Sequence, residues 1–406
     1  MRRIAASPLV LLPLVPLAWW LWQAHLPGSV PAVSARAYFT PAELARAHDY
    51  RAPSYLLDVL ALMLPAGVGV VLALWGGDRL ALGRRPALAG MIAAFLFAAV
   101  TAAAALPVEY VLHVRAHDRG IDLQSGPAWL GSALAELALM SVAVAVVYAI
   151  CRALAQHARP PWLAVGIAAW VAVALLTAIQ PLVIDPLFMS THPVTSPSAK
   201  ALIAGLERKM GAHPASVSVS DASSRTTAEN AFVNGLGPTV RMVIDDTTLR
   251  HSTRPELEAV VAHELGHVKR MHTLKGVLWF GVLALPSLWL IWRLLEPVAR
   301  RRRYAEGLLD PRAAALLLAG VLVASTLLTP VVNTISRRYE AEADWTALKA
   351  TGDGAGMVAL QRRLALSGVS SLQPPGWAVD LLFDHPPVLS RIAVARSVDR
   401  RSSRSE

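Results

Sequence analysis

Two histidines with a glutamate between them lie past the middle of the chain, in His263-Glu264-Leu265-Gly266-His267. On a helix, residues four apart share a face, so both imidazoles can reach one metal ion at about 2.0–2.1 Å. Glu264 is then placed to accept a proton from a water molecule that the metal activates, and not to bind the metal itself. The pattern therefore indicates a metal-dependent hydrolase.

The residues before this motif predict that it lies on a helix. Thr253-Arg254-Pro255-Glu256 has the pattern of a capping box with proline in the first turn. An apolar helix face follows, formed by Val260, Val261, Leu265 and Val268. The alternative is a helical histidine pair that holds no metal, but further parts of a metal site follow downstream.

A catalytic zinc ion needs three protein ligands and one position left for water. Cys151 is the one cysteine of the chain, so the ligands must come from His, Asp or Glu. His272 is close, but it lies only five residues past His267 and off its face. The better candidate for the third ligand is Glu340, in the acidic stretch 336–344 that follows the last apolar run.

Asp344 lies four residues after Glu340 and shares its helix face, whereas Glu342 points away. Asp344 can accept a hydrogen bond from the far nitrogen of a zinc-binding histidine and so fix its tautomer. The alternative for this stretch is a solvated amphipathic helix in which Arg337 and Arg338 pair with the acids.

The composition indicates a membrane protein. Hydrophobic residues make up 55% of the 406 residues and charged residues 16%, and the mean hydropathy is +0.46. An ordinary soluble domain has about 25% charged residues, so this excess of apolar residues predicts membrane spans. The net charge of +10 fits arginine-rich loops beside anionic lipid heads. Without a zinc finger or an RNA-binding signature, nucleic acid is not an expected partner.

Seven apolar stretches are long enough to cross about 30 Å of hydrocarbon as helices. The first also fits a signal peptide, because Arg2 and Arg3 precede it, but it continues into a tryptophan belt without a small-residue cleavage site. Asp58 and Glu136 fall in the second and fourth stretches, where they face a wet interior or simply bond a neighbouring helix. The seven predicted spans are residues 7–26, 55–77, 87–107, 129–151, 162–184, 274–295 and 313–333.

The spans divide the chain into four parts, and the predicted fold class is mostly α with a small α+β zinc-protease domain. Residues 1–185 would hold the first five spans, and 274–333 the sixth and seventh. The polar segment 186–273 contains alternating runs typical of strands and carries the histidine motif. Residues 334–406 would complete the protease domain and end in a disordered Ser/Arg tail.

The histidine motif together with Ser336-Arg-Arg-Tyr-Glu-Ala-Glu-Ala-Asp344 resembles the type-1 CAAX prenyl endopeptidases, which are integral-membrane zinc proteases of the gluzincin type. Weaker matches at 39–50, 120–125 and 181–188 follow the order of the family. The resemblance implies a barrel of seven transmembrane helices around a water-filled chamber, capped by the zinc domain. The short loop 296–312 favours a bacterial-type member in a bacterial cell membrane.

The same resemblance assigns residues that contact the substrate. Asn230, Ala231 and Phe232 would lie on an edge strand beside the zinc, where an extended substrate adds as a further strand. His385, within an Asp-His-Pro-Pro motif, would donate to the oxyanion of the reaction, and Arg391 would contact the substrate. The expected substrate is a peptide or protein, membrane-associated or lipidated, cleaved with Glu264 as general base.

Two other functions fit part of the sequence. A quality-control metalloprotease of the bacterial heat-shock type would share the zinc motif, but such proteins have fewer spans. A transporter or channel fits seven spans with two buried carboxylates, yet it has no use for a carboxylate between two metal-spaced histidines.

The orientation in the membrane is left open by two conflicting indications. The short connections on the side of the N-terminus carry 12 Lys and Arg residues, against 5 on the opposite side. The positive-inside rule then places the N-terminus in the cytoplasm and the zinc domain outside. The family resemblance instead implies the cytosolic catalytic domain of eukaryotic members.

Overall fold

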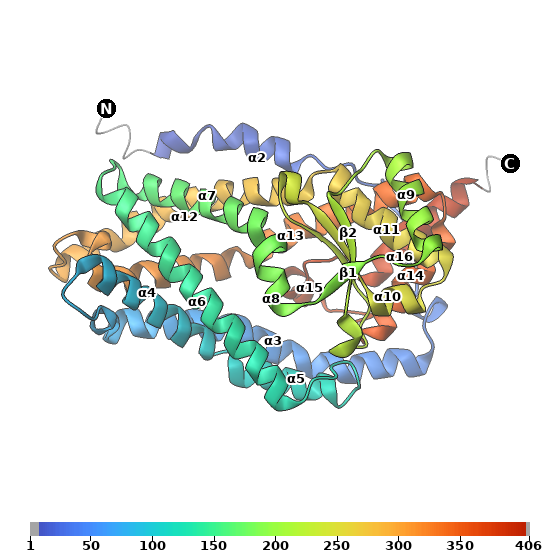
Figure 1. The fold of residues 1–406 in the computed structure, drawn as a ribbon, viewed down its shortest axis with the longest axis horizontal. Coiled ribbons are helices and arrows are strands. Elements are labelled where there is room, and N and C mark those ends of the chain that lie inside the picture. The colour runs from blue at the N-terminus through green and yellow to red at the C-terminus, as the bar shows by residue number, and fades with distance from the viewer. Residues whose placement is uncertain (1–7, 403–406) are drawn as a thin grey trace.

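The computed structural model describes residues 8–402, and most of this part of the chain is helical (Figure 1). Six helical stretches of the described residues are long and apolar enough to cross a membrane. The predicted class, mostly α with a small sheet, is confirmed. The long helices are α3 (Pro41–Trp75), α4 (Pro86–Ala103), α6 (Gly126–Gln156), α7 (Pro161–Ile179), α12 (His272–Arg301) and α13 (Ala314–Thr351).

The first predicted span, 7–26, is represented among the described residues by a shorter apolar stretch, Leu9–Trp22. Its regular part is α2 (Leu14–Trp22), which lies along the outside of the helical bundle (Figure 1). Leu21 of α2 is fully buried in a cluster that includes Trp279 and Tyr339. A count of seven spans thus stays a prediction, and Arg2 and Arg3 lie outside the described residues.

The remaining helices are shorter and lie mostly toward the sheet end of the molecule (Figure 1). A π-helical turn (Gln180–Ile184) joins α7 to α8, so that Pro161–Phe188 forms one spanning candidate. The predicted Ser/Arg tail falls on the last turn of α16 and on residues 403–406, which lie outside the described residues. These helices are α5 (Leu106–His117), α8 (Asp185–Phe188), α9 (Pro197–Met210), α10 (Asp246–His251), α11 (Arg254–Lys269), α14 (Gly354–Ser367), α15 (Gly376–Leu382) and α16 (Val388–Ser402).

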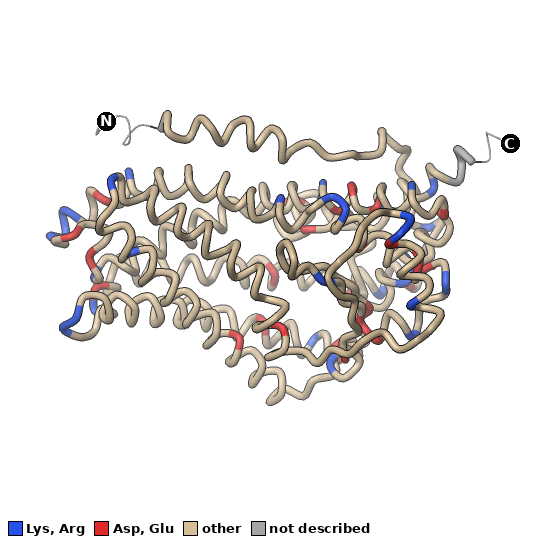
Figure 2. The backbone as a smooth tube through the Cα atoms, turned by 45° about the horizontal axis from the view of Figure 1, so that its top comes forward, with Lys and Arg blue, Asp and Glu red and all other residues tan. Residues whose placement is uncertain are grey.

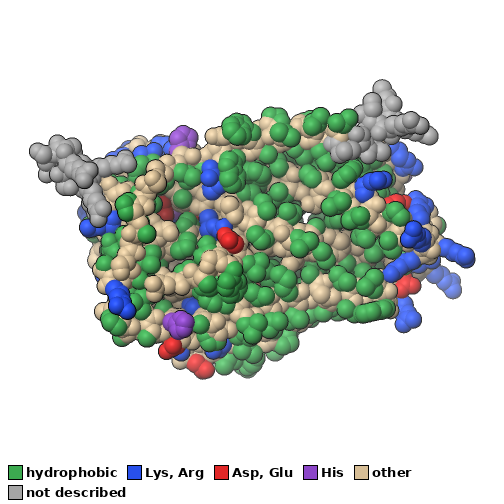
Figure 3. Space-filling model, turned by 180° about the vertical axis from the view of Figure 1, so that it is seen from behind, with side chains coloured by type: hydrophobic (Ala, Val, Ile, Leu, Met, Phe, Trp, Pro, Cys, Tyr) green, Lys and Arg blue, Asp and Glu red, His purple; other side chains and the backbone are tan. Residues whose placement is uncertain are grey.

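The outer surface of the long helices is apolar. Figure 3 shows hydrophobic side chains covering the middle of the molecule, and Figure 2 shows Lys, Arg, Asp and Glu gathered mainly toward its two ends. No more than a third of each spanning window is buried inside the molecule. Water does not tolerate so extensive an apolar surface, whereas hydrocarbon does. The protein is therefore a multi-pass membrane protein.

Of the two carboxylates predicted inside spans, Asp58 has a defined partner. Arg51, two turns earlier on α3, donates from Nη2 to Asp58 Oδ2 at 3.2 Å. Both side chains are about three-quarters buried. The pair lies within one helix, so it is not the bond to a neighbouring helix that the sequence left open, and a role facing a wet interior stays a prediction.

The sheet has four strands in the order β1-β2-β4-β3. β2 and β4 are parallel, and each outer strand is antiparallel to its neighbour. Met242 and Ile244 of β4 are fully buried against Val261 and Leu265 of α11. β3 forms one edge of the sheet, as the resemblance implied. The strands are β1 (Thr191–Pro193), β2 (Ser216–Ser220), β3 (Ala231–Asn234) and β4 (Arg241–Asp245).

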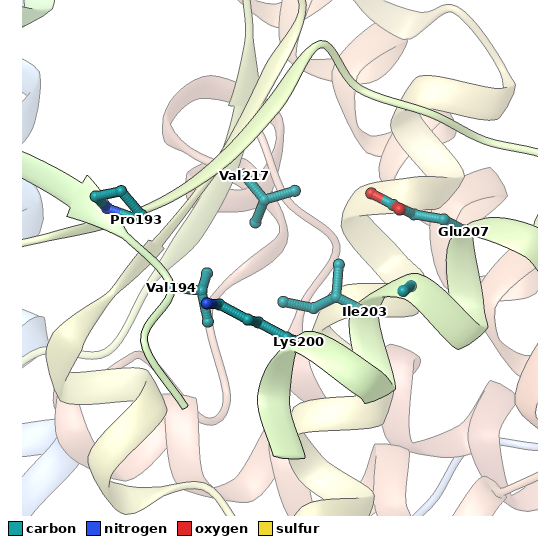
Figure 4. A pocket seen from close by; sticks show the side chains of 7 residues that line it. Pro193, Val194, Lys200, Ile203, Glu207 and Val217 are labelled. Atoms are coloured by element: carbon teal, nitrogen blue, oxygen red, sulfur yellow. The ribbon is translucent and has the colours of Figure 1, made fainter. Parts of the chain in front are cut away.

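A shallow depression lies toward the β1 edge of the sheet, between the β1–β2 pair and α9 (Figure 4). Figure 4 shows Lys200, Ile203 and Glu207 of α9 on one side of it, and Pro193 of β1 and Val217 of β2 on the other. No residue of the histidine motif lines it, so it is separate from the candidate metal site. Its lining residues are Pro193, Val194, Lys200, Ile203, Ala204, Glu207 and Val217.

The sixth and seventh predicted spans, in α12 and α13, are directly connected to the region around the sheet. α11 ends at Lys269, and α12 begins at His272 after Met271 adopts a left-handed conformation with φ 55°. The chain thus passes from the motif helix into the sixth predicted span within two residues. α13 continues from the last predicted span into the acidic stretch as one helix, so the predicted boundary at 333/334 falls inside it.

Candidate active site

The capping box predicted for the motif helix is confirmed. The backbone N–H and the hydroxyl of Thr253 both donate to Glu256 Oε2, each at 2.7 Å. Arg363 of α14 donates to the same oxygen at 2.8 Å. The first turn of α11 is thereby fixed by side chains, and the histidine motif follows two turns later.

α11 and α13 approach each other closely at the motif. A Cβ atom added at Gly266 would lie 3.1 Å from the Ala343 carbonyl oxygen, so a side chain there would push the helices apart. This proximity places the acidic face of α13 against the histidine face of α11.

The structure brings the three predicted metal ligands together. His263 Nε2 and His267 Nε2 lie 3.1 Å apart, and each is 3.3 Å from an oxygen of Glu340. Donor atoms around a tetrahedral zinc with bonds of 2.0–2.1 Å lie about 3.3 Å apart. Glu340 Oε2 is buried and has no hydrogen-bond partner among the described residues, so a cation would satisfy it. The three residues therefore fit a metal ion with one position open.

The electrostatic surroundings also suit a cation. Burial lowers the pKa of His267 to about 3, which keeps its imidazole neutral and its lone pair free. Burial opposes charge on His263 as well, but the Asp344 and Glu340 carboxylates outweigh it and raise its pKa to about 10. The negative potential that causes this rise favours a bound cation in the same way.

Glu264 is buried beside the ligands, with only 6% of its surface exposed. Burial raises the pKa of its carboxyl to about 7. A group with a pKa near ambient pH can both take up and release a proton, as a general base and acid must.

Asp344 lies behind His263, where the sequence predicted it. Its Oδ1 is 2.9 Å from His263 Nδ1, on the side away from the other ligands. Arg391 of α16 donates to both Asp344 oxygens, at 2.7 and 2.6 Å. The guanidinium of Arg391 is thus engaged with Asp344, and the substrate contact that the sequence predicted for it stays a prediction.

His385 lies at the exposed side of the ligands. Its Nε2 is 3.4 Å from Glu340 Oε2, its Nδ1 is 2.8 Å from Asp384 Oδ1, and 55% of its side chain is exposed. Burial opposes its charge, but the carboxylates of Asp384 and Glu340 raise its pKa. Its imidazole thus lies beside the open side of the site, where the two carboxylates favour its protonated form.

The predicted substrate segment lies at the edge of the sheet. Asn230 directly precedes β3, and its carbonyl accepts from Asp245 N at 3.0 Å and Thr248 Oγ1 at 2.8 Å. Ala231 is buried and Phe232 half-buried, and β3 packs against α11. The outer backbone edge of β3 pairs with no other strand of the described residues.

A second buried cluster was not anticipated from the sequence. Glu342 points away from the ligands, as predicted, but into a group of donors and not into solvent, and its side chain is 1% exposed. His272, which the sequence set aside as a ligand, lies between Glu342 and His267. The sequence feature that could have indicated this cluster is the short spacing of His267 and His272, which lie five residues apart on either side of a helix boundary.

Comparisons with known proteins agree with this site. Residues 195–399 match the model of peptidase family M48. The chain is 27% identical over 305 residues to an uncharacterized metalloprotease, YhfN, of Bacillus subtilis, an alignment that covers 73% of this chain and 71% of YhfN. It is 33% identical over 185 residues to a CAAX prenyl protease 1 homolog of Dictyostelium discoideum, which covers 43% of this chain and 42% of the relative.

The fold also matches a solved structure whose sequence is much less similar to this chain. The crystal structure of S. mikatae Ste24p superposes with a TM-score of 0.74 at 17% identity, over 97% of this chain and 99% of that one. The similarity to membrane CAAX proteases that the motifs suggested is thus confirmed at the level of family and fold. The family match covers the whole region that carries the three candidate ligands, and the chain belongs to peptidase family M48 as an integral-membrane metalloendopeptidase.

Proposed function

We propose that this metallopeptidase uses zinc, held by His263, His267 and Glu340, to hydrolyse peptide bonds at a bacterial cell membrane. The supporting observation is that two imidazole nitrogens and one carboxylate oxygen from two helices lie within 4.8 Å of one another. Two nitrogen donors and one oxygen donor with an open fourth position are typical of catalytic zinc.

A zinc ion held by these three residues would supply Lewis acidity toward a water molecule and toward the scissile carbonyl. Glu264 takes the proton of the attacking water and passes it to the leaving amine. His385 donates a hydrogen bond to the carbonyl oxygen as negative charge develops there. Asp344, held in place by Arg391, keeps the proton of His263 on Nδ1 so that Nε2 faces the metal. Attack by water leaves no covalent intermediate on the protein.

The substrate in this proposal is an extended peptide that adds to the outer edge of β3, next to Asn230, Ala231 and Phe232. A free strand edge offers alternating N–H and C=O groups, which bind any extended main chain. The apolar helices around the site favour a membrane-associated or lipidated peptide, and several relatives are named CAAX prenyl proteases. By the resemblance, the spans would enclose a chamber that receives such a substrate.

Zinc content and cleavage, measured on the same purified full-length protein, test this proposal. We expect one zinc ion per wild-type chain, none in Glu340→Gln, and zinc retention with a loss of cleavage of about 10²–10⁴-fold in Glu264→Gln. Glu258→Gln, on the same helix but outside the site, is the matched control. A wild-type protein without stoichiometric zinc, or a cleaving Glu264→Gln, would contradict the proposal. A peptide tested with and without an attached prenyl group shows whether the lipid contributes.

A further inference from the structure

A chain of buried polar groups begins behind the second metal-ligand histidine. His267 directs Nε2 toward His263 and Glu340, and its other ring nitrogen lies 3.0 Å from Nδ1 of His272. The two rings meet nearly edge to face, with an interplanar angle of 78°. His272 is the first residue of α12, so the contact crosses the turn between the motif helix and a membrane span.

The next link leads to a carboxylate. His272 Nε2 lies 3.2 Å from Glu342 Oε2 of α13, and the residue is only 6% exposed. Its ring stacks on Tyr339 with centroids 4.6 Å apart and an interplanar angle of 10°. The stacking and the Glu342 contact together fix the plane of the His272 ring.

Glu342 is approached by donors from two parts of the chain, His25 and the junction between α11 and α12. The backbone N–H of His25 donates at 2.9 Å, and His25 Nδ1 lies 3.0 Å away. Arg270 and Lys275 approach the carboxylate at 3.5 and 3.7 Å. With donors on every side, Glu342 acts as an acceptor toward His272.

These contacts allow one consistent arrangement of protons. To face a metal with the lone pair of Nε2, a neutral His267 must carry its proton on Nδ1. His272 must then offer an unprotonated Nδ1 to accept it, so its own proton lies on Nε2. That is the nitrogen which faces the acceptor Glu342.

We infer that His272 and Glu342 are positioning residues for the metal ligand His267. Glu342 selects the tautomer of His272, and His272 in turn fixes the tautomer and ring orientation of His267. The inference rests on the ligand set proposed above. Each of the two ligand histidines then has a carboxylate behind it. Asp344 contacts His263 directly, and Glu342 reaches His267 through the imidazole of His272.

The test measures zinc affinity by chelator competition, and the visible spectrum of the Co²⁺-substituted protein, on the purified full-length chain. His272→Phe keeps a ring against Tyr339 but has no acceptor, so zinc should bind 10–100-fold more weakly, as is typical when such partners are lost. His272→Asn places an amide oxygen where Nδ1 was, so its affinity should return to within a few-fold of wild type, with the Co²⁺ spectrum restored.

The matched control is His113→Phe. His113 is also buried, lies 2.8 Å from a carboxylate oxygen of Asp122 and stacks on Trp129, but it belongs to α5 and contacts none of the ligands. We expect this variant to bind zinc as tightly as wild type. The control separates loss of a buried histidine in general from loss of the acceptor behind His267.

Wild-type zinc affinity in His272→Phe would overturn the inference, as would His272→Asn binding as weakly as His272→Phe. If His272→Phe does not fold, His272→Gln replaces it, because its amide lies farther along the side chain and leaves a methylene near His267. Equal zinc affinities of the Asn and Gln variants would then overturn the inference. A wild-type protein that binds no zinc would refute the ligand set and this inference with it, whereas tight wild-type binding that is unaffected by the variants would refute the inference alone.

Discussion

The two proposed proton-donating residues of the site, Glu264 and His385, differ strongly in their exposure to solvent. Glu264 is 6% exposed, whereas 55% of the His385 side chain is exposed. A buried carboxyl is shielded from bulk water and exchanges its proton with groups in the site, and an exposed imidazole can meet an arriving substrate. This contrast supports the proposed roles of Glu264 as general base and of His385 as oxyanion donor.

Replacing His385 by Asn should reduce kcat by about 10²–10³-fold, the usual cost of removing one oxyanion donor. Zinc content and KM should change little, because His385 is not one of the three ligands. Steady-state kinetics with a peptide substrate measure both constants. Asp380→Asn is the control, since that carboxylate is exposed and contacts Arg337 at 3.5 Å. A raised KM with unchanged kcat would instead assign His385 to substrate binding.

Glu256 makes the stability of the motif helix depend on pH. Burial alone would raise its pKa, but hydrogen bonds from Arg363 and Thr253 outweigh burial and hold the pKa below its usual value. Because the pKa is lower in the folded than in the unfolded protein, ionised Glu256 contributes stability above pH 4.5, and this contribution is lost as the pH falls through the folded pKa.

Glu256→Gln should therefore lower the free energy of unfolding by about 1 kcal/mol at pH 7, a typical value for a helix cap. The difference from wild type should shrink as the pH falls from 4.5 and disappear below the lower pKa of the folded state, where the wild-type carboxyl is neutral in the folded protein too. Denaturant unfolding across this pH range checks both statements. Glu258→Gln serves as the control on the same helix, and a pH-independent difference would contradict the role of the charge.

At the scale of elements, the site depends on the distance between α11 and α13. Gly266→Ala places a methyl group about 3.1 Å from the Ala343 carbonyl and must move one backbone against the other. We expect a loss of about 1–3 kcal/mol in stability, as for other overpacked contacts, together with weaker zinc binding because Glu340 moves with α13. Thermal unfolding and chelator competition measure the two effects. Gly276→Ala on α12, where nothing lies within 4 Å, should show neither.

The sequence predicted those parts of the site that depend on local spacing. The four-residue intervals between His263 and His267, and between Glu340 and Asp344, are regular only on helices, and the capping box defines where one helix starts. The contact between His25 and Glu342 joins residues 317 positions apart, and no local pattern reports it. Tertiary packing alone brings the two together.

Hydropathy predicted which segments are apolar better than it predicted where their helices begin and end. The apolar run of α13 stops near 333, but its polar continuation keeps strong helix formers, so the backbone continues to Thr351. The run 7–26 shows the opposite case. Its residues are apolar, but the regular helix begins only at Leu14, directly after Pro13.

On the scale of the whole molecule, the charges indicate an orientation in the membrane. The loops that follow α3, α6 and α12 lie at the end away from the sheet, and Figure 2 shows Lys and Arg gathered there. The positive-inside rule places this end in the cytoplasm and the site on the opposite side, contrary to the cytosolic site that the family resemblance implied. A reporter enzyme fused after Glu406 should therefore be active only outside the cytoplasm. A cytoplasmic signal would reject the charge argument.

Because α13 runs unbroken from the membrane span to Glu340, we expect catalysis to depend on the thickness of the lipid bilayer. With 38 residues, the helix is about 57 Å long, whereas the hydrocarbon layer is about 30 Å thick. One way for a helix to adjust to a thinner or thicker bilayer is to tilt, and we expect a tilt of α13 to displace Glu340 from the imidazoles on α11. Peptide cleavage in proteoliposomes should thus peak at one acyl-chain length, while equal rates across a series of chain lengths would show that the two are uncoupled.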